Sequence, residues 1–276
     1  MGFGWCCGCL LGCLVWSTCE AGVDARGAAQ GGARELVIQV QADAAWNERP
    51  EDALRVFQSA AGELWRFFPG RTLPPILVEP TGGPILLYRR GPAGEYYVRL
   101  NTGHRLWAQH AYQFAHEFCH ILCNSAAQKY RNKWFEESLC ELASLFVLRR
   151  MAQTWETQPP YPNWKNYAPS LAKYADERIA KAQLPAGMTL AEWFRHESEH
   201  LYANATLREK NTIVAVALLP LFEKQPEHWE AVWYLNAAAS SQAESFAEFL
   251  RQWRDAAPEK HRAFITEIAR QFGIDL

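Results

Sequence analysis

Strand-like sequence patterns are confined to the first hundred residues of this chain, and helical patterns fill the rest. Short runs with strand character occupy residues 35–41, 75–79, 85–89 and 95–100. The last two flank the turn residues Gly91–Gly94 and predict a hairpin. Between the first two runs, an amphipathic pattern predicts a helix that begins at Pro50 and is ended by Pro69. The sequence therefore predicts a small N-terminal sheet with one helix on it.

From Arg105 onward, strand signals stop. Residues 105–123 and 134–156 have the periodicity of two long helices, and about five further helical patterns follow Pro160. Thr189-Leu-Ala-Glu192 is a capping box that begins one of them, and Gly273 is a plausible helix C-cap. Strands first and helices afterwards predict an α+β protein: a small mixed sheet with a helix, two long helices, then an all-α C-terminal bundle.

The composition is that of an ordinary globular protein and argues against nucleic acid or an anionic membrane as a partner. The chain has 276 residues, and its 28 basic and 30 acidic side chains give a net charge of −2. A chain this balanced has no global attraction for nucleic acid or an anionic membrane. We predict three segments: a leader and flexible linker at 1–33, a core at 34–157, and a helical C-terminal subdomain at 158–276.

Five of the eight cysteines fall in the first 19 residues, where no side chain between Gly2 and Thr18 is charged. This short apolar segment predicts export by an atypical signal, to the periplasm or outside the cell. Leu10–Cys13 loosely resembles a lipoprotein cleavage box, which would give a membrane anchor. No basic residue precedes the apolar run, so a mis-assigned start codon on a cytoplasmic protein is the alternative.

Cys119, Cys123 and Cys140 are the remaining cysteines. Their odd number argues against a disulfide framework. We expect them to be small buried hydrophobic residues.

The sequence His116-Glu117-Phe118-Cys119-His120 lies within the first long helical pattern. Residues four apart share one face of a helix, so both imidazoles can reach a single metal ion. Neutral imidazole is a typical zinc ligand, and Glu117 lies close enough to deprotonate a metal-activated water. We predict His116 and His120 as ligands of one Zn²⁺ per chain, and Glu117 as the catalytic general base.

The same H-E-x-x-H spacing occurs again from His196 to His200. This second copy carries a charge at Glu199 and has polar surroundings, whereas Phe118 and Ile121 are among the apolar neighbours of the first copy. A helix that holds a catalytic metal must exclude bulk water. We therefore expect the second copy to lie on a solvated helix face by coincidence.

A hydrolytic zinc site needs a third protein ligand and one open position. The next helical pattern contains adjacent Glu136 and Glu137, which point about 100° apart on a helix, so only one of them can face the metal. Glu137, Glu141 and Ser144 lie on one stripe, separate from the apolar stripe of the same helix.

These motifs resemble the gluzincin metallopeptidases, of the thermolysin and aminopeptidase N type, and especially the compact minigluzincin or peptidase MA-like proteins. The resemblance rests on His116–His120 followed by Trp134-Phe-Glu-Glu-Ser138, and it covers residues 35–155. It implies that the predicted core is a zincin-like catalytic domain, that Glu137 is the third zinc ligand, and that Glu141 orients a ligand histidine.

The resemblance implies further features of the site. An edge strand aligns the peptide substrate in zincins, and Tyr96–Asn101 is the candidate here. The family uses a Tyr or His from a later helix to stabilise the oxyanion, a role that Tyr202 matches by position, with His196 and His200 as alternatives. The chain lacks a Gly-Ala-Met-Glu-Asn-like segment for a free amino terminus, and Thr81–Pro84 is no substitute, which argues against aminopeptidase activity.

The sequence thus predicts a zinc metallopeptidase that hydrolyses peptides or proteins. One alternative is a catalytically inactive gluzincin-like module that binds zinc or peptide, and another is a helical domain in which the motif arises by chance. Cys123, seven residues after His116, offers a further alternative, since a third ligand there would give a structural site and close the open position.

Overall fold

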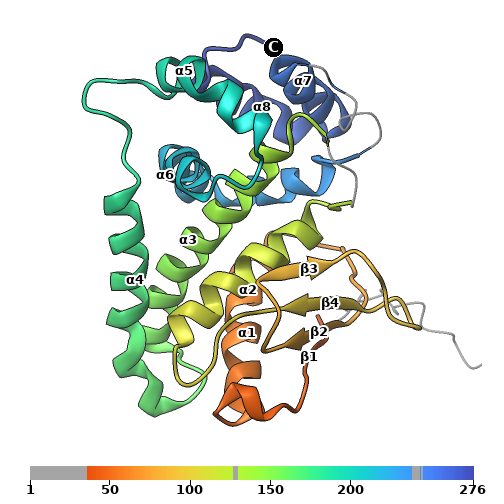
Figure 1. Cartoon of the computed structure of the whole chain (residues 1–276), viewed down its shortest axis with the longest axis vertical. Helices are drawn as coiled ribbons and strands as arrows, with labels where there is room; N and C mark the ends of the chain where they lie inside the picture. Colours follow the sequence, from red (N-terminus) through yellow and green to blue (C-terminus); the bar gives the residue numbers. More distant parts are fainter. Residues whose placement is uncertain (1–35, 127–129, 238–242, 244) are drawn as a thin grey trace, which may run out of the picture. The chain divides into compact units, whose positions relative to one another are not determined.

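One mixed sheet and a larger set of helices make up the part of the chain described by this computed structural model, residues 36–126, 130–237, 243 and 245–276 (Figure 1). These residues belong to a compact unit, Ala33–Leu276, and the predicted boundary at 157/158 falls inside it. The predicted leader and linker, 1–33, lie outside the described residues. Among the helices that are described, none is long and apolar enough to span a membrane.

The sheet has the strand order β1-β2-β4-β3. Its strands are β1 (Ile38–Val40), β2 (Ile76–Glu79), β3 (Ile85–Leu87) and β4 (Tyr96–Arg99). β1 and β4 both run parallel to β2, while β3 pairs antiparallel with β4, with Leu86 opposite Val98. The mixed sheet and the β3–β4 hairpin expected from the sequence are therefore present.

The edge strand differs from the sequence expectation. Tyr96–Asn101 is the segment expected to form the substrate-aligning edge, but β4, which lies within it, is placed between β2 and β3 and is paired on both sides. After β2 the chain first forms β3 and then β4, and it is β4 that pairs with β2. The first strand of the hairpin, β3, therefore lies at the edge of the sheet. β3 is thus the antiparallel edge strand.

Helices occupy most of the remaining described residues. They are α1 (Pro50–Trp65), α2 (Trp107–Leu122), α3 (Lys133–Thr157), α4 (Ala168–Lys181), α5 (Leu190–Ala203), α6 (Arg208–Lys224), α7 (Phe246–Ala256) and α8 (Glu259–Gln271), with 3₁₀ helices η1 (Ala44–Trp46), η2 (Pro162–Tyr167) and η3 (Pro226–Tyr234). The α+β class is confirmed, and the boundaries of α2 and α3 lie within two residues of those expected.

Two helix-terminal signals in the sequence are confirmed. The Thr189 hydroxyl accepts a hydrogen bond from the Glu192 backbone N–H, and the Glu192 carboxylate accepts one from the Thr189 backbone N–H, as in a capping box. Gly273 follows α8 with φ of 70°, a left-handed conformation that favours glycine after a helix end.

Helix α3 lies at the centre of the described fold (Figure 1). It packs against α1, α2, α4 and α6, and its residues are buried around nearly the whole circumference of its middle turns. A helix buried on all sides cannot be amphipathic, so the apolar stripe expected from the sequence is only one of several apolar faces of α3. The core is therefore built around the helix that carries the predicted third ligand.

The start of α3 is held to the C-terminal helices by aromatic packing. Phe135 is fully buried, and its ring centroid lies within 6.2 Å of those of Phe246, Phe249, Trp253 and Phe272. Aromatic contacts of this kind add to the free energy gained by burying the rings. The C-terminal bundle thus supports the helix on which Glu137 lies.

We predict that Phe135→Ala lowers the free energy of unfolding by about 3–5 kcal/mol, because it leaves a cavity among four aromatic rings. Urea denaturation followed by circular dichroism measures the change. Leu106→Ala is the control, since Leu106 is 49% exposed and its truncation should stay within about 0.5 kcal/mol of wild type. Equal effects of the two substitutions would contradict this account of the core.

Candidate metal centre

Helix α2 brings His116, Glu117 and His120 together inside the protein. All three side chains are buried, and the two imidazole rings lie 5.0 Å apart between centroids. The four-residue spacing puts both rings on the face of α2 that meets α3. The first H-E-x-x-H copy thus lies in the water-poor setting expected for it.

Glu137 on α3 lies opposite both histidines. Its Oε2 atom is 3.4 Å from His116 Nε2 and 3.6 Å from His120 Nε2. One carboxylate oxygen of α3 therefore lies within 3.6 Å of an imidazole nitrogen of each histidine on α2.

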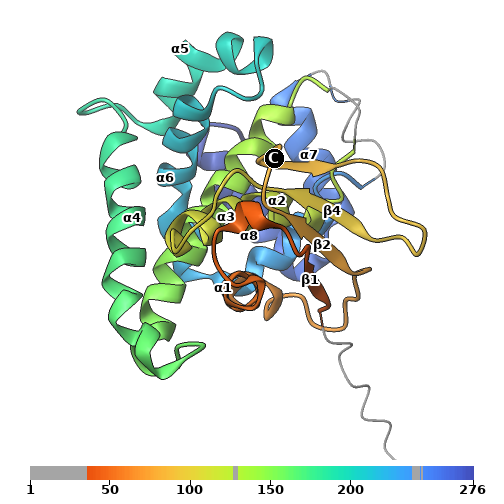
Figure 2. The same ribbon diagram turned by 60° about the horizontal axis from the view of Figure 1, so that its bottom comes forward.

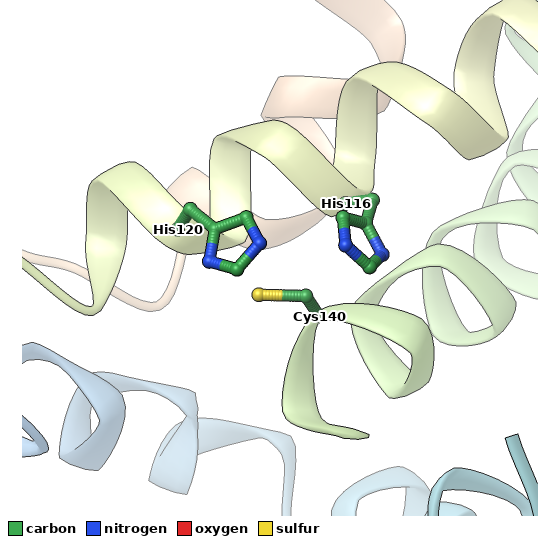
Figure 3. A group of neighbouring side chains, drawn as sticks. All are labelled: His116, His120 and Cys140. Atoms are coloured by element: carbon green, nitrogen blue, oxygen red, sulfur yellow. The ribbon is translucent and has the colours of Figure 1, made fainter. Parts of the chain in front are cut away.

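Cys140 approaches the same histidines from α3, as Figure 3 shows. One donor atom from each of His116, His120 and Cys140 lies within 4.8 Å of the others, and all three residues are buried. This group could hold a metal ion. Two side chains one helical turn apart, Glu137 and Cys140, thus compete for the position of third donor.

Charge and access favour Glu137 over Cys140 as the third donor. Burial raises the pKa of the Cys140 thiol well above its usual value, and the thiolate is the form that binds metals. Burial also opposes ionisation of Glu137, but its contacts with His116 and His120 outweigh burial and hold the pKa of this carboxyl well below its usual range. Glu137 also lines a cavity, whereas Cys140 does not.

Glu136 contacts His120 from the side opposite Glu137. Its Oε1 lies 2.6 Å from His120 Nδ1. Burial raises the pKa of Glu136, but the hydrogen bond from His120 and the charges of His120 and Lys133 outweigh it and lower this pKa to about 2. The ionised carboxylate can only accept, so Nδ1 carries the proton and directs Nε2 toward the metal position.

Three more side chains hold the Glu136 carboxylate. Lys133 Nζ donates at 2.6 Å, while the Tyr130 hydroxyl and Asn236 Nδ2 each donate at 2.7 Å. Asn236 also donates to the backbone carbonyl of Cys123, at the end of α2, at 2.9 Å. Glu136 is therefore a buried carboxylate with a full set of donors, which fixes its orientation toward His120.

Glu141 lies near the other histidine. Its Oε1 is 3.8 Å from His116 Nδ1, and this buried nitrogen has no hydrogen-bond partner in the described chain. The Tyr112 hydroxyl donates to Glu141, and Arg208 Nε lies 3.1 Å from its Oε1. The carboxylate expected to orient a ligand histidine is thus next to His116, beyond hydrogen-bond distance.

A cavity of about 380 Å³ opens over these groups. Its lining includes His116, Glu117, His120, Glu137, Glu141, Arg208 and, from the edge-strand region, Pro84, Ile85, Leu86 and Tyr88. The cavity therefore combines the histidines and carboxylates with one side of the edge strand β3.

Tyr202, expected to stabilise an oxyanion, lies elsewhere. Its ring packs edge-on against Trp134 and Phe194, with the Arg131 guanidinium carbon 4.0 Å from the ring centroid. Tyr202 does not line the cavity, whereas Arg208 does. The helix that carries Tyr202, α5, packs on α3, and its contacts with Trp134 and Phe194 place the Tyr202 ring against the aromatic core.

The second H-E-x-x-H copy lies on an outer face of α5. His196 and His200 are exposed, and Glu197 Oε2 pairs with His200 Nδ1 at 2.8 Å and with Lys210 Nζ at 2.5 Å. This is the solvated arrangement expected for a coincidental copy.

The three cysteines of the described chain are free and fully buried, as expected. Cys123 Sγ lies 3.9 Å from Cys119 Sγ, and the metal-competent histidine group contains Cys140 in place of Cys123. A His116/His120/Cys123 site therefore finds no support in the geometry.

Sequence reasoning did not identify Glu136, Cys140 or Arg208. Adjacent Glu136 and Glu137 suggested that one faces the metal, yet the same 100° separation lets the other reach the far nitrogen of His120. Cys140 stands one turn after Glu137 and could have been assigned to the same stripe. Arg208 begins α6 and carries no local sequence signal.

Comparisons with known proteins give no match for this chain. No protein-family model matches it, and neither a curated protein nor a solved structure does.

We predict that Co²⁺ bound to the protein gives visible d–d bands without the intense near-ultraviolet sulfur-to-cobalt charge-transfer band, because we expect Glu137 and not the Cys140 thiolate to be the third donor. Cys140→Ser should leave this spectrum unchanged, and Glu137→Gln should weaken binding. Cys119→Ser is the matched control for loss of a buried thiol. A charge-transfer band that disappears only in Cys140→Ser would make the thiolate the third donor.

We predict that Glu136→Gln lowers metal affinity about 10–100-fold, because the neutral amide holds His120 less firmly in the required tautomer. Competition with a chromophoric chelator measures the affinity. Glu63→Gln is the control, since Glu63 is a similarly buried carboxylate on α1 that accepts from Thr154 at 2.6 Å. Unchanged affinity in Glu136→Gln would show that the contact with His120 is dispensable.

Proposed function

We propose that this protein is a zinc-dependent metallopeptidase of gluzincin type. The observation that carries the proposal is the approach of Glu137 Oε2 to the Nε2 atoms of His116 and His120, with Glu117 lining the same cavity. Ligands about 2.0–2.1 Å from a tetrahedral zinc ion lie roughly 3.3–3.4 Å from one another. The 3.4 and 3.6 Å separations match that requirement.

The donor set also fits zinc in a hydrolytic site. Two imidazoles and one carboxylate leave a fourth position open, which structural zinc sites do not. A bound zinc ion would supply Lewis-acid polarisation of the scissile carbonyl and would acidify the attacking water. Glu136 and Glu141, beside the far nitrogens of the two histidines, are the kind of partners that orient ligand imidazoles.

Glu117 is the proposed general base. It is buried, lies on α2 between the two histidines in sequence, and lines the cavity. A carboxylate in that position can take a proton from the attacking water and return it to the leaving amine.

Strand β3 is the proposed aligning strand for the peptide. It is the antiparallel edge of the sheet and contributes Ile85 and Leu86 to the cavity lining. An extended peptide can add to such an edge through main-chain hydrogen bonds, which suits recognition of a peptide backbone. Ile85, 43% exposed, and Tyr88, 49% exposed, are available for side-chain contacts.

Arg208 is the proposed donor to the substrate carbonyl in place of Tyr202. Its side chain is exposed, lines the cavity, and is anchored through Nε to the buried Glu141 carboxylate. A fixed guanidinium can stabilise the negative charge that develops on oxygen during acyl transfer. The absence of Tyr202 from the cavity lining favours the second candidate function, a module that binds zinc or peptide without turnover.

We predict that Glu117→Gln reduces kcat/KM for peptide hydrolysis by about 10²–10⁴-fold, because the amide cannot accept the proton. The zinc content should stay at one equivalent. A diverse set of internally quenched peptides and elemental analysis provide the two readouts.

Glu197→Gln is the matched control, because Glu197 occupies the same place in the second, exposed H-E-x-x-H copy. Its activity should equal that of wild type. Zinc bound without any cleavage by wild type would favour the binding module, and a metal-free wild-type protein would refute the peptidase and leave only a module that binds peptide.

A further inference from the structure

A second cavity, of about 370 Å³, adjoins the first at Arg208, which lines both. Its other lining residues come from α2, from α6 and from α4 with the residue after it, and Figure 2 shows α4 running beside α6. A ligand that extends past Arg208 from the histidine cavity would therefore enter this second cavity.

The second cavity is cationic. Arg178, Lys181 and Arg208 line it, against a single carboxylate, Glu209. Within the described chain, no carboxylate forms an ion pair with Arg178 or Lys181, whereas the nearby Lys173 pairs with Glu177 at 3.8 Å. Unpaired cations gathered in a concave site attract anions more strongly than dispersed surface charges do.

Arg178 is held in place without using all of its donors. Its guanidinium carbon lies 4.4 Å from the Tyr112 ring centroid and 4.1 Å from that of Tyr174, and it donates to the Tyr174 hydroxyl. Its Nε atom is buried and has no hydrogen-bond partner. Because Nε is shielded from solvent, a carboxylate in the cavity would be bound through the terminal N–H groups of this positioned guanidinium.

We infer that this second cavity binds a carboxylate of the peptide substrate, with Arg178 and Lys181 as the specificity-determining residues. The inference rests on the proposed peptidase function, because the ligand reaches the cavity as the continuation of a peptide in the histidine cavity. The carboxylate belongs either to an acidic side chain or to the C-terminus of the peptide. Nucleic acid is a poorer fit, since the chain as a whole carries a net charge of −2.

The test measures peptide binding without turnover. Zinc-loaded Glu117→Gln protein is immobilised and incubated with a proteome-derived peptide library, and the retained peptides are sequenced by mass spectrometry. The expected result is enrichment of Asp or Glu at a fixed position, or of peptides that end at a fixed distance from the shared motif. The first pattern identifies a side-chain carboxylate and the second a C-terminal one. A second library with all carboxyl groups amidated should lose the enrichment.

Combining protein variants with an altered peptide then tests whether Arg178 and Lys181 bind the carboxylate. For the best retained peptide, replacing its carboxylate with an amide should weaken binding about tenfold, the loss expected for one charge-assisted hydrogen bond. Lys181→Gln should cause the same loss for the acidic peptide and none for the amide. Arg178→Gln should behave likewise, and the exposed Lys181 keeps the test valid if Arg178→Gln fails to fold. Lys173→Gln, on the same helix outside the cavity, is the control and should bind both peptides as well as the parent does.

The outcomes separate this inference from the proposed function. Glu117-dependent hydrolysis by wild type with no acidic preference among retained peptides would overturn the inference and leave the peptidase intact. Acidic peptides retained by a protein that cleaves nothing would support the cavity and refute the peptidase. A library from which nothing is retained overturns the inference.

Discussion

The packing of α2 against α3 with polar side chains buried in their interface is the constraint on which the rest of the molecule depends. Two imidazoles and three carboxylates lie in or beside this interface. Buried charges cost free energy unless each finds partners. The surrounding structure meets this demand with Lys133, Tyr130 and Asn236 around Glu136, and with Tyr112 and Arg208 around Glu141.

The need of these buried groups for partners explains what the other helices and strands contribute. The sheet contributes one edge, β3, to the rim of the cavity, and η3 and the residues after it contribute a donor to Glu136. Helices α7 and α8 hold Phe135 and with it the first turn of α3, next to Glu136 and Glu137. The apolar core thus fixes the backbone at the positions where the charged groups need close distances, because packed interiors resist displacement.

Features of the site that depend on the spacing of residues within one helix were predictable from the sequence. Features that depend on strand order or on contacts between helices were not. The spacing of His116 and His120 fixes their common face, and the stripe containing Glu137 follows from the same periodicity. The place of β3 at the edge depends on β4 returning to β2, which no window of sequence encodes. Glu136, Cys140 and Arg208 acquire their roles through contacts between helices, and Tyr202 is turned into the aromatic core by packing that sequence spacing does not reveal.

The hydrogen bonds of Asn236 have a consequence for the order in which the centre can be assembled. The amide joins the Glu136 carboxylate to the end of α2, although it lies 100 residues beyond Glu136 in the chain. During synthesis from the N-terminus, both histidines and Glu137 leave the ribosome long before this donor does. Full orientation of Glu136, and through it of His120, is therefore a late event, available only to a chain that has extended well into its C-terminal helices.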